Sequence, residues 1–396
     1  KNNTFKEFLI PECYTYNIGY KGMCGSLLIS DHSDACIMGI HVAGCVTGRR
    51  GISEVLSRET FESLPIDCPE PVEMDLEPLL EGQMQPDTYV HVLGRVPSDL
   101  AMSAPTDSSM IPTECYDEIF PVLTDKPILG PNDKRNLYKF SPLKEGINKH
   151  GIITSDFPPE HLEASKTFLI DKLNTFVKPS RHNVGKMKKY EAIVGIKDLP
   201  NYEPMDFNTS EGFPLRVFRP PMYSSKKWLF DLTTDALGNY ECNGINPHLR
   251  EIMKVKKIQR LNKYLPFTVF SDCLKDRKLE KSKIMVPGKV RVFSISPVDF
   301  TIQCRQYFTD FTVAYQNARL DADHSVGINV NSIEWTMLAN KLRDKGSKIV
   351  TADYSNFGPS LNLDCVLLAF EIINAWYARY QDDDFVKDHN RIRTII

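Results

Sequence analysis

One stretch of the sequence, residues 348–363, limits the possible fold more than any other. It reads KIVTADYSNFGPSLNL. The β-branched residues at 349–351 predict a short strand at 348–352 that leads to Asp353, and Gly358-Pro359 then breaks the backbone. From Leu363 onwards, apolar residues recur every three or four positions, which predicts a helix with one apolar face. These residues are Leu363, Val366, Leu367, Phe370, Ile373 and Tyr377.

Asp353 occupies a position that suits a metal ligand. A carboxylate at the end of a strand and in front of a helix is a common ligand for a divalent metal in phosphoryl-transfer sites. The same pattern fits an aspartate that caps a helix or a turn. The pattern alone leaves both interpretations open.

A strongly basic stretch at residues 275–293 precedes it. Seven Lys or Arg residues stand there against Asp276 and Glu280, with a Pro-Gly turn at 287–288. In an extended KVRVF segment, Lys289 and Arg291 would share one face, because alternate residues of a strand point to the same side. Such a cluster can bind a phosphate backbone or a triphosphate. Residues 181–189 and 250–263 are also basic, and for the latter a solvated helix face explains the charges equally well.

The N-terminal region contains a cysteine between glycines. GMCGS at residues 22–26 leaves the N–H groups of Met23 and Cys24 free to form an oxyanion hole, with Cys24 as a nucleophile. No histidine precedes Cys24, so His41 in GIHVAG would have to reach back if it were the general base. A buried structural cysteine and a core histidine would be the ordinary interpretation of either residue alone.

Length and composition indicate the class of protein that contains these motifs. A chain of 396 residues predicts two or three domains, and its 42% hydrophobic content is enough for normal cores. No run approaches the roughly 18 apolar residues of a membrane-spanning helix. The ten cysteines form no CxxC pair and no Cys/His cluster at zinc spacing, which favours a reducing, cytoplasmic setting. The missing initial Met, and an end at Ile396 without a closing element, suggest a piece of a longer protein.

An acidic, proline-rich stretch at residues 51–85 predicts a linker. We place the domain boundary near Gln83, which divides the chain into residues 1–83 and 84–396. Two helices are predicted further along, at residues 159–178 and 247–264.

Four stretches in order resemble the fingers and early palm of RNA-directed RNA polymerases of picorna-like positive-strand RNA viruses, above all dicistroviruses and iflaviruses. They are NTSEGFPL at 208–215, the basic stretch at 275–293, HSVGINVNSIEW at 324–335 and the stretch at 348–364. GMCGS with GIHVAG is similar to the C-terminal part of the chymotrypsin-like (picornavirus 3C-type) cysteine protease that precedes the polymerase in those polyproteins. The resemblance implies an α+β multidomain chain: the C-terminal part of an all-β double barrel, followed by part of a right-hand polymerase.

The resemblance assigns roles to polymerase residues. It implies that Asp353 is catalytic and binds Mg²⁺ (or Mn²⁺), with further ligands from elsewhere. The residues implied to hold the nucleoside triphosphate are Lys275, Lys283 and Arg291. Those implied to border the template channel are Thr209, Ser210 and Gly212. Many relatives have a second Asp where this chain has Gly358, so recognition of the ribose 2′-hydroxyl would depend on another residue, with Asn362 or Asp364 as candidates.

For the protease, the resemblance implies that Cys24 is the nucleophile and that Met23 and Cys24 form the oxyanion hole. His41 and Gly44 would line a pocket that reads a Gln or Glu side chain, an interpretation we favour over a His41 dyad. The base and the acid of the family precede the nucleophile, outside this chain, and the chemistry needs no cofactor. Gln83-Met84 is a plausible self-cleavage site.

The implied partners are an RNA template and primer, nucleoside triphosphates, the viral polyprotein as protease substrate, and a protein primer. The implied location is the host cell cytoplasm at membrane-associated replication complexes. The family's nucleotide-binding SG…T…N segment and Gly-Asp-Asp hairpin do not occur before Ile396, and the three aspartates at 382–384 are not that hairpin, so we expect the chain alone to be inactive. Two alternatives remain: a non-enzymatic single-strand RNA-binding module, insensitive to Mg²⁺, or a protease fused to an unrelated helical domain.

Overall fold

A computed structural model of the chain divides into two compact units, residues 1–68 and 69–396. It describes residues 13–16, 27–29, 37–45, 50–55, 76–78, 90, 92–103, 105–116, 121–152, 154–381 and 386–396. In the first four ranges it describes the backbone. The division falls after Cys68, before the boundary expected near Gln83 and inside the predicted linker.

The described residues of the first unit form an antiparallel sheet of four strands. They are β1 (Cys13–Tyr16), β2 (Leu27–Ile29), β3 (Ile37–Cys45) and β4 (Arg50–Val55), in the order β1-β4-β3-β2. The register between β3 and β4 shifts after His41, which pairs with Ser53, while Gly44 pairs with Gly51. Met23 and Cys24 lie outside the described residues.

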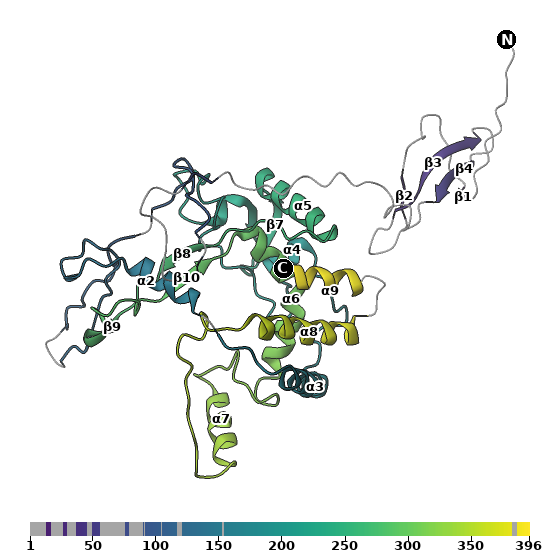
Figure 1. The fold of residues 1–396 in the computed structure, drawn as a ribbon. Helices are drawn as coiled ribbons and strands as arrows, with labels where there is room; N and C mark the ends of the chain where they lie inside the picture. The colour runs from purple at the N-terminus through teal and green to yellow at the C-terminus, as the bar shows by residue number, and fades with distance from the viewer. Residues whose placement is uncertain are drawn as a thin grey trace. The chain divides into compact units, whose positions relative to one another are not determined.

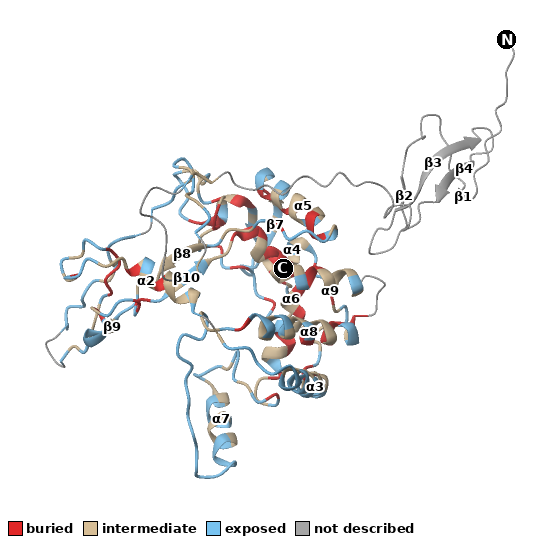
Figure 2. Ribbon diagram, viewed as in Figure 1, coloured by how far each residue is buried: buried red, intermediate tan, exposed pale blue. Residues whose placement is uncertain are grey.

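The second unit is built around helix α6 (Val298–Asn317), which occupies the centre of this unit in Figure 1. Nine residues of α6 are buried, and their spacing places them on one broad face of the helix. The helix packs against α4 (Lys189–Val194), α5 (Pro247–Leu261), α8 (Leu363–Tyr380) and α9 (Val386–Ile395). The buried residues, red in Figure 2, concentrate along this helix.

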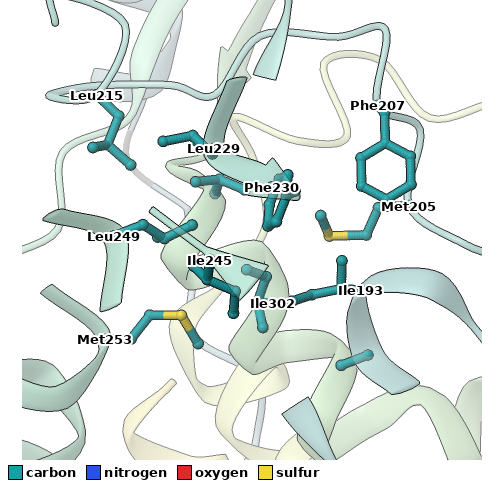
Figure 3. Close-up of a cluster of buried hydrophobic side chains, with 12 residues drawn as sticks. Ile193, Met205, Phe207, Leu215, Leu229, Phe230, Ile245, Leu249, Met253 and Ile302 are labelled. Atoms are coloured by element: carbon teal, nitrogen blue, oxygen red, sulfur yellow. The ribbon is translucent and has the colours of Figure 1, made fainter. Parts of the chain in front are cut away.

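Two apolar clusters hold the helices together. The larger one, shown in Figure 3, joins Ile193, Leu249 and Ile302 to the hairpin of β6 (Phe230–Thr234) and β7 (Tyr240–Ile245). The second joins α6 and α8 to α3 (Pro159–Phe176) around Trp376, which is 1% exposed. Because α6 contributes to both clusters, its position is fixed by packing. Segments bonded to its N-terminal end are therefore held in place with it.

The remaining elements of the unit are short. A two-stranded sheet pairs β8 (Ser271–Leu274) with β10 (Val292–Ile295), and another pairs β5 (Thr124–Asp125) with β9 (Leu279–Glu280). The helices that complete the described part are α2 (Pro142–Asn148), the 3-10 turns η1 (Lys149–Gly151), η2 (Lys226–Leu229) and η3 (Lys281–Lys283), and α7 (Ile333–Arg343). No described helix is long and apolar enough to cross a membrane.

The predicted helices are confirmed, with starts that follow from capping. Asn246 accepts a hydrogen bond from the N–H of His248 and Pro247 occupies the first helical position, so α5 begins there. Asn362 accepts from the N–H of Asp364 and begins α8. α3 spans Pro159–Phe176, close to the predicted 159–178.

One local prediction was wrong, and the burial of a correctly predicted helix varies along its length. Residues 348–354 form no strand, and Val350 is 94% exposed, because a strand needs a hydrogen-bonding neighbour and no described strand lies beside this segment. The predicted apolar face of α8 is also not uniformly buried: Leu363 is 68% exposed. The buried residues of α8 are Ile372, Trp376 and Tyr377, where α3 and α6 cover the helix, whereas Leu363 in its first turn belongs to neither cluster.

Candidate functional site

The loop at residues 208–212 is fixed by its own hydrogen bonds and by a glycine. The Thr209 hydroxyl donates to the Asp206 carbonyl oxygen at 3.0 Å, and the Gly212 N–H donates to the Ser210 hydroxyl at 3.2 Å. Gly212 has φ +75°, and a Cβ there would lie 2.6 Å from the carbonyl oxygen of Ser296. Two independent features therefore exclude a side chain at Gly212: the left-handed backbone conformation and the close contact with Ser296. Thr209 remains exposed at the loop's outer side.

Glu211 anchors this loop from inside. Its carboxylate is fully buried, and its Oε1 accepts from Arg219 Nε at 2.8 Å and from Trp228 Nε1 at 2.9 Å. Its backbone carbonyl accepts from the N–H of Val298 at 2.8 Å, at the start of α6. The loop that carries Thr209, Ser210 and Gly212 is thus attached to the central helix.

The basic stretch follows β8 and leads into β10. The N–H of Lys275 donates to the carbonyl oxygen of Arg291 at 2.8 Å, so the two residues lie side by side. Lys289 and Arg291 are exposed while Val290 between them is buried, the alternation expected if the two cations share a face, although the strand itself begins at Val292. Lys283, in η3, pairs with Glu280 at 2.8 Å on the surface.

An acidic residue inside the basic stretch holds it to a distant loop. Asp276 accepts from the Ser108 hydroxyl at 2.6 Å and from the Ser109 N–H and hydroxyl at 2.7 and 2.9 Å. Burial raises the pKa of Asp276, but these three hydrogen bonds outweigh it and lower the pKa below its ordinary value. Asp276 therefore stays ionised and engaged with the loop, and the cations around it keep an excess of positive charge.

Asp353 lies in an exposed, irregular segment that the structure connects to the basic stretch. Three residues after it, Asn356 Oδ1 accepts from Lys149 Nζ at 3.5 Å, and the same ammonium donates to the carbonyl oxygen of Gly288. No group of three or more His, Cys, Asp or Glu side chains within the described residues could hold a metal ion. Asp353 accordingly presents a single exposed carboxylate, and the described residues do not complete a metal site.

The two candidates for replacing the second aspartate differ. Asn362 is 7% exposed, and its side-chain oxygen accepts from the Asp364 N–H at 2.7 Å, so it is occupied as the cap of α8. Asp364 is exposed. At Gly358, a Cβ would meet nothing within 4 Å, so the position is sterically open.

The structure places the protease candidates only in part. His41 and Gly44 lie on β3, two strands away from the edge strand β1, and Cys24 with Met23 falls outside the described residues. Their assumed roles stay predictions.

Sequence reasoning missed three residues that hold the candidate site together: Lys149, Glu211 and Arg219. Lys149 contacts residues 139 and 207 positions away, so no local pattern could have revealed it. For Glu211 the local sequence gave no signal of burial, because a glutamate among small polar residues is ordinary in a solvated loop. Its burial against Arg219 and Trp228 required the fold.

Comparison with known proteins identifies the family. The model of the viral RNA-dependent RNA polymerase family matches residues 154–395. The chain is 39% identical to the genome polyprotein of Deformed wing virus over 98% of this chain and 13% of that polyprotein. It is 27% identical to the replicase polyprotein of Drosophila C virus, over 95% of this chain and 22% of the relative. These matches confirm the resemblance to iflavirus and dicistrovirus replicases.

A solved structure supports the same fold. The Sicinivirus 3Dpol RNA dependent RNA polymerase superposes with a TM-score of 0.59 at 20% sequence identity, over 76% of this chain and 56% of that one. The chain therefore spans about a fifth or less of the polyproteins, and a little over half of the solved polymerase. The match over residues 154–395 excludes an unrelated helical domain. The chain belongs to the family of viral RNA-dependent RNA polymerases.

Proposed function

We propose that the protein of which this chain is part synthesises RNA from nucleoside triphosphates on an RNA template. The proposal rests on one observation: the 208–212 loop, the basic stretch and the Asp353 segment are all connected by hydrogen bonds or by directly adjoining elements. Glu211 ties the 208–212 loop to the start of α6, directly after β10, and Lys149 ties the Asp353 segment to the turn at Gly288. Segments that a nucleotide, a template and a metal would each require thus lie on connected elements.

In this proposal the chain's own residues bind and orient the reactants. Lys275, Lys283 and Arg291 hold the triphosphate and stabilise the negative charge that develops on the leaving pyrophosphate. Thr209 and Ser210 contact a template phosphate, and the missing side chain at Gly212 lets the loop sit close to the backbone of Ser296.

Asp353 fits Mg²⁺ or Mn²⁺ through its exposed carboxylate, because both ions prefer oxygen ligands. A bound pair of such ions supplies activation of the primer 3′-hydroxyl and neutralisation of the leaving phosphates. The described residues provide only this one carboxylate, so the proposal assigns the remaining ligands to other parts of the protein. A protein primer in place of an RNA primer is compatible with the same residues.

We further propose that residues 1–83 are the C-terminal part of a cysteine protease that processes the polyprotein, and residues 84–396 the N-terminal part of the polymerase. The antiparallel sheet of the first unit and the 98% coverage by the Deformed wing virus polyprotein support this division. Cys24 would be the nucleophile, Met23 and Cys24 the oxyanion hole, and His41 with Gly44 the pocket wall. Cleavage at Gln83-Met84 and a location at membrane-associated replication complexes in the cytoplasm belong to the same proposal.

Primer extension tests the polymerase proposal. Because this chain covers 56% of the polymerase that it resembles, the assay uses a longer protein from the same reading frame, with Mg²⁺, nucleoside triphosphates and a primed RNA. We expect Asp353→Ala to lower extension by about 10³-fold or more, equivalent to about 4 kcal/mol. Asp344→Ala, which removes an exposed aspartate at the end of α7, is the matched control and should extend like the wild type.

Equal activity of the Asp353→Ala and wild-type proteins would remove Asp353 from the site. If neither protein extends a primer, and both bind single-stranded RNA with strong salt dependence and no response to Mg²⁺, the non-enzymatic RNA-binding module is correct instead.

A further inference from the structure

Lys149 donates the hydrogen bond that links the Asp353 segment, residues 349–361, to another part of the described molecule. It follows α2 as the first residue of η1, and no sequence motif includes it. Every other hydrogen bond of residues 349–361 within the described part stays inside that segment, such as Ser360 N–H to Asn356 O at 2.9 Å. The Lys149 ammonium alone crosses to it, at Asn356.

The opposite end of this link is a turn shaped to receive the lysine. Gly288 has φ +70°, and a Cβ on it would lie 2.7 Å from Lys149 Cε. The absence of a side chain therefore lets the lysine stem cross the turn and donate to the Gly288 carbonyl oxygen. The next residue is Lys289, one of the two cations on the exposed face.

The charges at this place are not balanced. Lys149 is half-buried and forms no ion pair with a described residue, and Lys289 repels it. Burial first, and this repulsion second, lower the pKa of Lys149 below its ordinary value. An anion placed between the two ammonium groups would gain from both, since each is short of a negative partner.

Asn356 is well suited to accept this hydrogen bond on the Asp353 segment. Its backbone has φ +52°, a left-handed conformation that asparagine tolerates better than most residues. Because Lys149 binds Asn356, the backbone is restrained three residues after Asp353. This restraint limits the positions that the Asp353 carboxylate can take.

We propose that Lys149 is a positioning residue that couples the basic stretch to the Asp353 segment, and that the triphosphate of the incoming nucleotide strengthens this coupling. The nucleotide part of the proposal rests on the proposed function. Lys149 acts through Asn356 and Gly288, and the catalytic roles remain with Asp353 and its metal ions.

Hydrogen exchange on this chain tests the coupling without any need for polymerase activity. The probe is inorganic tripolyphosphate, and the readout is amide exchange in residues 286–290 and 356–361. In the wild type we expect tripolyphosphate to slow exchange in both ranges by about 3- to 10-fold, the size of one net hydrogen bond. Lys149→Gln should abolish the effect at 356–361, whereas Lys144→Gln, an exposed lysine on α2, should behave like the wild type.

Steady-state kinetics of the longer polymerase provide the second arm. We expect Lys149→Gln to lower kcat at least about tenfold with a smaller change in the KM for nucleotide, and Lys149→Arg to recover most of the loss. Asn356→Ala should cause a similar loss, and the double variant should lose no more than either single variant, because both break one link.

The outcomes are separable. If the wild type does not extend primers, the proposed function fails, while the exchange experiment still decides the coupling. If Lys149→Gln changes only KM and adds independently to Asn356→Ala, Lys149 is simply a charge that binds phosphate, and the positioning role is wrong. Faster exchange throughout the second unit in Lys149→Gln would mean a general structural role and would equally overturn the proposal.

Discussion

Two irregular segments carry the predicted template-channel and metal-binding residues of the polymerase part, and they are held in opposite ways. The 208–212 loop has a buried carboxylate, Glu211, at its centre and a glycine pressed against the backbone of Ser296. The 349–361 segment is exposed along most of its length, with Val350 94% and Tyr354 79% exposed. The first is fixed by groups in the protein interior, and the second by one ammonium group from outside.

The difference shows where preorganisation comes from. A buried ion pair resists movement, because separating it would leave a charge in a medium of low dielectric constant. An exposed segment can exchange its hydrogen bonds for water at little cost. The template-side loop is therefore expected to have one conformation with or without ligands, whereas the metal-side segment is expected to gain order from its ligands.

Removing the buried carboxylate should have the largest effect on stability. Glu211→Ala leaves Arg219, whose side chain is 7% exposed, as an unpaired buried charge, and we expect a loss of about 3–5 kcal/mol in the free energy of unfolding. All three tryptophans, at 228, 335 and 376, lie in the second unit, so denaturant unfolding followed by their fluorescence reports on that unit alone.

Glu251→Ala, on the exposed side of α5, is the control and should change the stability by less than about 1 kcal/mol. A loss below about 1 kcal/mol for Glu211→Ala as well would show that the loop does not depend on its buried ion pair.

A pair of aliphatic truncations compares the two regions directly. Leu249→Ala removes a side chain with 0% exposure from the cluster that supports the 208–212 loop, so we expect about 2–5 kcal/mol of destabilisation. Val350→Ala, in the exposed segment, should lie within about 0.5 kcal/mol of the wild type. Similar losses for both would mean that the 349–361 segment is packed in solution rather than exposed to solvent.

Replacing a buried or an exposed tyrosine should reveal the smallest difference in stability between the two regions, and only at alkaline pH. Burial raises the pKa of Tyr307, on α6, to about 12, and the folded protein therefore holds this proton more tightly than the unfolded chain. The resulting stabilisation is fully present below about pH 10 and is lost as the pH rises through about 12, by about 3 kcal/mol. Tyr307→Phe should flatten the decline in stability over this range.

Tyr354→Phe, in the exposed segment, serves as the matched control, and we expect it to leave the alkaline unfolding profile of the wild type unchanged. Unfolding at a series of pH values, followed by tryptophan fluorescence, measures both variants. An unaltered profile for Tyr307→Phe would assign the alkaline transition to other buried groups.

Local patterns in the sequence were sufficient to predict a substantial part of the fold and the site. Apolar spacing predicted α3, α5 and α8, because a helix forms its hydrogen bonds within one segment. The alternation of charged and apolar residues around Val290 predicted that Lys289 and Arg291 lie on the same face of the extended segment. The order of the polymerase motifs indicated the family, which the match over residues 154–395 established.

The tertiary structure decided what depends on distant partners. The strand predicted at 348–352 was absent, because a strand's hydrogen bonds belong to a neighbour that the local sequence does not specify. The burial of Glu211 against Arg219 and the reach of Lys149 to Gly288 and Asn356 arise only when separate segments pack together. The sequence alone determined the helices, the basic face and the family, since these follow from short-range periodicity and motif order. Only the fold decided how the site segments are held, since that depends on contacts between residues up to 207 positions apart.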